Sequence, residues 1–170
     1  NNLTPSARSV YAIDMDGDGD VDVLSASHSD DKIAWFENNG SQSFTAHTIT
    51  TSADGANFVF AIDLDRDGDM DVLSTQDGGG ELPEIAWYRN NGSQSFTALT
   101  IGTCPCALNS VYALDVDKDG DIDVVSNGAE GPGVNTAVKW YENNGSQSFT
   151  EHVITSGAGG VQSVYAGDMD

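Results

Sequence analysis

A segment of about 50 residues occurs three times along this chain of 170 residues and then begins a fourth time. The leading aspartates of the copies are 49, 52 and 53 residues apart. A period of this length is typical of propellers, solenoids and other repeat arrays, because each copy is one supersecondary unit that stacks on its neighbours. Each copy contains a Val-aromatic-Ala-x-Asp run, and these runs end at Asp14, Asp63, Asp115 and Asp168.

Length differences between the copies fall in a single loop. From the tryptophan of each copy to the next leading aspartate is always 28 residues, whereas from the leading aspartate to the tryptophan is 21, 24 and 25 residues. Loops that vary on a fixed scaffold are where recognition usually resides. The variable loops span about 28–32, 76–84 and 127–137.

Each copy is expected to form four short antiparallel strands. Runs of β-branched and aromatic residues alternate with Gly, Asn and Asp, and no segment has the 3.6-residue apolar period of a helix. Four antiparallel strands in about 50 residues make one propeller blade, whereas the coils of a parallel β-helix would be much shorter. The fold class expected is therefore all-β, with β-propeller blades of four antiparallel strands. In the first copy the expected strands are 10–13, 21–26, 33–37 and 44–49.

Residues 1–170 are expected to form one β-propeller repeat segment. Propellers typically have about four to eight blades. We therefore expect a fragment of a longer polypeptide, or a homo-oligomer in which several copies complete one ring. The expected repeats are about 9–57, 58–109 and 110–162, followed by a partial repeat at 163–170.

Each complete copy carries an acidic loop with the pattern Asp-x-Asp-x-Asp-Gly-Asp-x-Asp. Carboxylates at loop positions 1, 3, 5 and 9 can surround one hard cation, with a backbone carbonyl at position 7. All-oxygen ligation favours Ca²⁺ over zinc or copper, so we expect about one Ca²⁺ per complete repeat. The candidate metal ligands are Asp14, Asp16, Asp18, Asp20 and Asp22; Asp63, Asp65, Asp67, Asp69 and Asp71; and Asp115, Asp117, Asp119, Asp121 and Asp123.

An EF-hand is the main competing interpretation, because it opens with the same alternation of aspartates. Its loop needs a bidentate glutamate at position 12, where this chain has Ser25, Ser74 and Ser126. The residues that follow are typical of a strand and not of a helix. The loops therefore fit strand-to-strand connections better than EF-hands.

The sequence resembles the FG-GAP or VCBS repeats, which form the β-propellers of integrin α-subunits and of many secreted bacterial and fungal proteins. The resemblance is carried by the acidic loops followed by Val/Ile/Met-Asp-Val, and by the Ile-Ala-Trp-Phe/Tyr strand that precedes Asn-Asn-Gly. It implies a propeller, commonly of seven blades, with calcium between the first and second strands of a blade and ligand binding on the opposite face. The chain departs from the family in the aspartate at loop position 7 and in having too few blades.

Connections in an up-and-down blade alternate between its two ends. The acidic loop and the Asn-Asn-Gly turn should therefore lie on one face, and the variable loop and the link between blades on the other. We expect the second face to contact a glycan or a protein.

The net charge of −21 excludes some partners. Phosphate groups would be repelled, so neither nucleic acid nor an anionic membrane is an expected partner. No run approaches the roughly 18 apolar residues of a membrane span, so membrane insertion is not expected either. A secreted or cell-surface location is expected.

A binding module, and not an enzyme, is the leading functional hypothesis. The conspicuous acids are assigned to metal, and no His-Glu-x-x-His or Gly-x-Ser-x-Gly motif occurs. Two alternatives stay open: a non-catalytic accessory portion of a larger secreted polysaccharide-active enzyme, and a self-assembling scaffold array.

Two other sets of residues have structural interpretations. The periodic tryptophans Trp35, Trp87 and Trp140 are expected to pack between blades and not to form a sugar-stacking platform. Cys104 and Cys106 flank one proline, and a bridge between them would close a very small ring. The sequence therefore favours unbridged cysteines.

Overall fold

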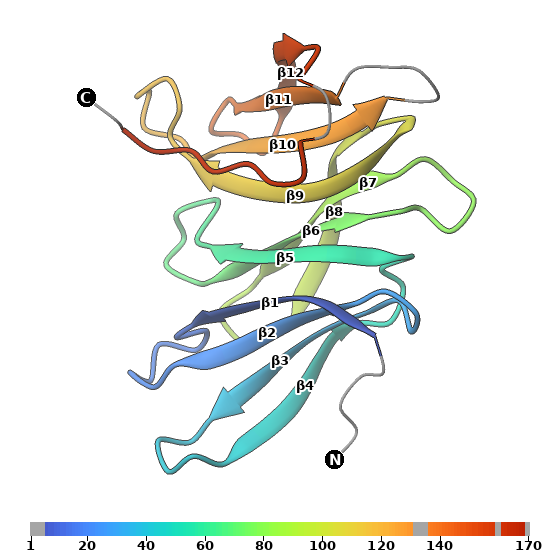
Figure 1. The fold of residues 1–170 in the computed structure, drawn as a ribbon. Helices are drawn as coiled ribbons and strands as arrows, with labels where there is room; N and C mark the ends of the chain where they lie inside the picture. Colours follow the sequence, from blue (N-terminus) through green and yellow to red (C-terminus); the bar gives the residue numbers. More distant parts are fainter. Residues whose placement is uncertain (1–5, 131–135, 159–160, 169–170) are drawn as a thin grey trace.

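The computed structural model describes residues 6–130, 136–158 and 161–168. These residues form strands and no helix. They therefore contain no long apolar helix of the kind that crosses a membrane. The strands form three four-stranded antiparallel sheets, which follow one another in chain order and do not close into a barrel (Figure 1). The expected all-β class with four-stranded blades is confirmed.

The bounds of the strands repeat from blade to blade. The first blade contains β1 (Ala7–Ile13), β2 (Asp22–Ser27), β3 (Lys32–Asn38) and β4 (Phe44–Thr50). The second contains β5 (Ala56–Ile62), β6 (Asp71–Gln76), β7 (Glu84–Asn90) and β8 (Phe96–Thr103). The third contains β9 (Cys106–Leu114), β10 (Asp123–Glu130), β11 (Thr136–Asn143) and β12 (Phe149–Ser156).

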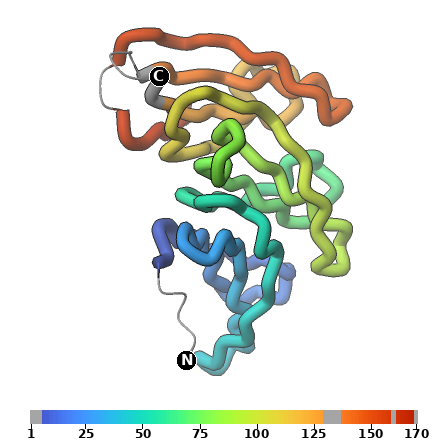
Figure 2. Tube along the Cα trace, turned by 90° about the vertical axis from the view of Figure 1, so that its right-hand side faces the viewer, coloured from blue at the N-terminus to red at the C-terminus, as the bar shows by residue number. Residues whose placement is uncertain are grey.

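The first strands of successive blades lie next to one another. A ladder of tilted aromatic rings joins them: Tyr11 and Phe60 have ring centroids 4.9 Å apart, and Phe60 and Tyr112 also 4.9 Å. Tyr165 continues the ladder at 4.7 Å from Tyr112. The tube in Figure 2 follows the blades in the same order, from the blue to the red end of the chain.

The hydrophobic core lies mainly between blades. Trp35 is 2% exposed and belongs to a cluster that includes Val59 and Tyr88 of the second blade. Trp87 is 1% exposed and belongs to a cluster that includes Leu108 of the third blade. The prediction that the periodic tryptophans pack between blades is confirmed for Trp35 and Trp87. Trp140 is only half-buried.

The acidic loops and the Asn-Asn-Gly turns lie on the same face, as the alternation of connections predicts. A Cβ atom added to Gly40 would lie 2.4 Å from Asp20 Oδ2, and the φ of Gly40 is +71°. Glycine is therefore needed at this turn both for its backbone conformation and for the close approach of the loop. At the other end of the first blade, Ala53 N–H donates to the carbonyl of Asp31 (2.8 Å), which joins the link between blades to the variable loop.

The expectation of unbridged cysteines is wrong, because Cys104 and Cys106 form a disulfide. Cys104 N–H donates to the carbonyl of Pro83 (2.9 Å), and β9 starts at Cys106, so the backbone turns sharply between the two blades. The turn leaves the two Cα atoms 5.0 Å apart, within the usual range of about 4.4–6.8 Å. Both cysteines are buried. The small ring is possible because the junction between the blades imposes this turn.

The position of each tryptophan predicts different effects of the same substitution. Trp87→Ala should lower the free energy of unfolding by about 3–5 kcal/mol, because it removes a fully buried indole between two blades. Trp140→Ala should cost less than half as much, since the indole is half-buried. Urea unfolding followed by circular dichroism measures both values. Equal losses would contradict the placement of the core between blades.

Candidate metal centre

Each acidic loop is folded by its own first aspartate. In the loop between β1 and β2, the N–H groups of Gly17 and Gly19 donate to the two carboxylate oxygens of Asp14, at 2.8 and 2.9 Å. Gly19 has a φ of +96°, which an L-residue rarely adopts. The same contact recurs in the other blades, where Gly68 N–H donates to Asp63 (3.0 Å) and Gly120 N–H to Asp115 (3.1 Å).

The following aspartates brace one another through the backbone. Asp16 Oδ1 accepts the N–H of Asp18 at 3.2 Å, and Asp18 Oδ1 accepts the N–H of Asp20 at 2.8 Å. These side chain-to-backbone bonds tighten the loop and hold the carboxylates close together. The loop is therefore shaped by the residues that could bind an ion.

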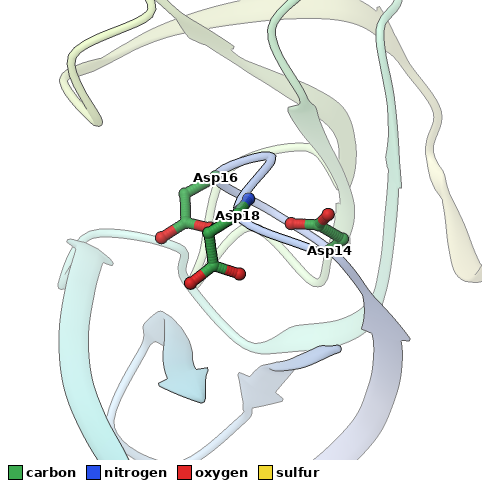
Figure 3. A group of neighbouring side chains, drawn as sticks. All are labelled: Asp14, Asp16 and Asp18. Carbon is green, nitrogen blue, oxygen red and sulfur yellow. Dashed lines mark hydrogen bonds between the residues drawn. The ribbon is translucent and has the colours of Figure 1, made fainter. Parts of the chain in front are cut away.

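The structure brings three predicted ligands together in each loop. Figure 3 shows the first group, on the loop that follows β1. In each group, one ligand atom from each residue lies within 4.8 Å of the others. The groups are Asp14, Asp16 and Asp18; Asp63, Asp65 and Asp67; and Asp115, Asp117 and Asp123.

The aspartate at loop position 9 joins the loop to the sheet. Asp22 is fully buried, and its carboxylate accepts the N–H of Met15 at 2.9 Å and of Asn38 at 2.7 Å. The equivalent residues Asp71 and Asp123 accept matching bonds. In the third loop alone among the described groups, this aspartate also belongs to the triad.

The aspartate at position 7 faces the neighbouring turn. Asp20, Asp69 and Asp121 lie against Gly40, Gly92 and Gly145, the glycines of the Asn-Asn-Gly turns. None of the three belongs to a described triad. A backbone carbonyl ligand at position 7 therefore stays a prediction. In the third loop Asp119 also lies outside the triad.

Sequence reasoning missed one residue of each centre. The first asparagine of the Asn-Asn-Gly turn, at the end of β3, supports the acidic loop. In addition to its backbone bond to Asp22, the side-chain amide of Asn38 donates to the carbonyl of Val21 at 3.2 Å. Asn90 and Asn143 make the same contacts with Met70 and Ile122. The sequence signal for this role is that the asparagine recurs at the same position in all three copies.

Desolvation and mutual repulsion disfavour the ionised form of four loop aspartates. Burial raises the pKa of Asp16, Asp65 and Asp117, and neighbouring carboxylates raise it further. Burial also raises the pKa of Asp71 to about 6, against the lowering effect of the N–H from Asn90. A carboxyl that stays ionised in such a place needs a positive partner.

Some buried carboxylate oxygens in the loops have no hydrogen-bond donor, which is compatible with a bound cation. Among the described residues, Asp63 Oδ1, Asp65 Oδ1 and Asp115 Oδ1 are buried and have no hydrogen-bond partner. Such an acceptor costs free energy unless something supplies the missing interaction. A metal ion would supply it, and an all-carboxylate and carbonyl donor set suits a hard divalent cation such as calcium. The three triads could therefore each hold a metal ion.

Comparisons with known proteins agree with this geometry. The model of the FG-GAP-like repeat matches three overlapping segments, residues 14–74, 63–126 and 115–170. A search of curated proteins found no match. Each matched segment begins at the leading aspartate of an acidic loop, and together the segments extend over most of the chain. The chain therefore belongs to the FG-GAP-like repeat family, whose repeats form binding modules of the β-propeller type.

Proposed function

We propose that this chain is a calcium-stabilised, non-catalytic binding module of an extracellular protein. The observation that carries the proposal is the set of buried carboxylate oxygens without donors, which occur in all-oxygen triads of the second and third blades. Membership of the FG-GAP-like repeat family supports an extracellular role. The Cys104–Cys106 disulfide supports it as well, because disulfides persist mainly in oxidising compartments.

Calcium would act structurally. When bound, it neutralises the carboxylates of a loop and replaces their missing hydrogen bonds. The loop is already tied to both neighbouring strands, since the buried Asp22 accepts bonds from Met15 and from Asn38 of β3. An ion in the loop therefore stabilises the connection of β1, β2 and β3. At a hundredfold excess over Kd, the stabilisation is about 2.7 kcal/mol per site.

The opposite face is proposed to hold the ligand. There His28 Nε2 lies 3.0 Å from Asp77 Oδ2, and Asn57 Nδ2 donates to Asp77 Oδ1 at 2.6 Å. These contacts join the variable loops of the first and second blades into one polar surface. Imidazole, amide and carboxylate groups suit the hydroxyls of a glycan or the polar groups of a protein. Residues 131–135 of the third variable loop lie outside the described residues.

Calcium should raise the thermal stability of the chain. In millimolar calcium we expect a midpoint at least several degrees above that in chelator, because ions bind the folded loops and not the unfolded chain. Asp16→Asn should reduce the increase. Asp20→Asn removes the same charge but keeps the position 7 carbonyl, so it should reduce the increase less. An unchanged midpoint in chelator, measured by differential scanning calorimetry, would exclude the structural role of calcium.

The effect of calcium should grow with pH. Without metal, the raised pKa of Asp71, about 6, means that folding favours its protonated form. The stability from this group is present below its unfolded pKa of about 4 and is lost as the pH rises through about 6. Calcium needs the ionised form, so its binding reverses this trend. Thermal midpoints with and without calcium should therefore differ more at pH 7.5 than at pH 5, and a pH-independent difference would contradict this assignment.

Substitutions on the two faces should separate stability from recognition. Asp77→Ala removes the acceptor shared by His28 and Asn57, so it should lower binding on a glycan array or to a captured protein ligand at least tenfold. Calcium stoichiometry should not change. Asp16→Asn is the matched control on the other face, and at low temperature it should retain ligand binding. Loss of binding in Asp16→Asn alone would place recognition on the calcium face.

A further inference from the structure

The three acidic loops differ in the charges around them. The chain has only 6 basic residues, and the second and third blades place some of them beside the loops. Arg66 and Lys118 occupy loop position 4, where the first loop has Gly17. Arg89 follows Tyr88 in β7 and lies close enough to Asp65 to attract its carboxylate. The first loop has no basic residue at either position.

A hydrogen-bonded chain holds Arg89 at the middle loop. Arg89 Nη1 donates to Gln147 Oε1 at 3.0 Å, and Gln147 Nε2 donates to Asp65 Oδ2 at 3.5 Å. Gln147 comes from the turn between β11 and β12, so these bonds join the middle acidic loop to the third blade.

The other two blades have an acid at the position of Arg89. In the first blade it is Glu37, whose carboxylate lies 2.7 Å from His47 Nε2 and repels the nearby carboxylate of Asp16. In the third blade it is Glu142, which lies 2.6 Å from His152 and likewise repels Asp117. This position thus carries a negative charge beside the first and third acidic loops and a positive charge beside the middle loop.

We propose that Arg89 makes the middle loop, Asp63–Asp71, the weakest of the three cation sites and the last to fill. The proposal rests on calcium binding as put forward above. A guanidinium keeps its charge at every relevant pH, so it repels an incoming divalent ion. The amide of Gln147 also donates to Asp65 Oδ2, so an ion that uses this oxygen competes with that hydrogen bond.

The middle loop nevertheless has the features of a site. Asp63 Oδ1 and Asp65 Oδ1 are both buried without a partner, so the loop can still accept an ion. The Gln147 amide donates only to the other oxygen of Asp65, and Arg89 reaches Asp65 through Gln147. They act on the affinity of the site without replacing its ligands.

Calcium titration calorimetry on the full chain tests this arrangement. The wild type should show tight sites and one weaker site. Arg89→Glu introduces the acid that the first and third blades have at this position. It should tighten the weaker site about tenfold, because it replaces repulsion of the nearby divalent ion by attraction. Glu37→Arg should weaken one tight site by a similar factor. Asp65→Asn should remove the weak binding phase, whereas Asp16→Asn should remove a tight one.

Arg8→Glu is the matched control. It makes the same change in net charge but lies at the start of β1, at the opposite end of that strand from its acidic loop. It should leave all affinities within about twofold, because salt screens exposed charges beyond roughly 10 Å. Equal effects of Arg8→Glu and Arg89→Glu, or equivalent sites in the wild type, would overturn the proposal and leave the calcium function intact.

Melting in chelator gives a second readout that does not need a bound ion. Arg89→Glu should lower the midpoint more than Arg8→Glu, because it replaces a positive charge that attracts the Asp65 carboxylate with a negative one. An equal decrease would contradict the role of Arg89. If the wild type binds no calcium, the proposed function and this inference both fail.

Discussion

A fully buried aspartate at the start of the second strand ties together three parts of each blade. In the first blade this residue is Asp22, which accepts hydrogen bonds from the beginning of the acidic loop and from the end of β3. A buried carboxylate is costly unless its oxygens are satisfied. The rest of the loop is arranged around this contact, since the contact fixes both ends of the loop.

The crowding of these carboxylates connects the local structure to function. Asx-type bonds from one aspartate to the next shape each loop, yet they leave buried oxygens without donors in the second and third blades. Hydrogen bonds within the protein thus satisfy only some of the carboxylate oxygens of the loops. The chemistry that suits the remaining oxygens is that of a hard divalent cation.

Contacts between blades make the loops unequal. Indole rings fill the space between neighbouring sheets, and an aromatic ladder joins their first strands. On the acidic face, the bonds from Arg89 to Gln147 and from Gln147 to Asp65 extend this connection to a loop. Sites with the same ligand pattern therefore experience different electrostatic fields.

Local patterns in the sequence determined the repeat, the four-stranded blade and the position of each acidic loop, because strand periodicity and turn chemistry act over a few residues. Only the tertiary structure decided which carboxylates meet, that Cys104 and Cys106 are bridged, and that Asn38 supports its loop. Those contacts depend on how strands and blades pack. Arg89 and Gln147 are 58 residues apart, and their contact exists because stacking of the second and third blades brings them together.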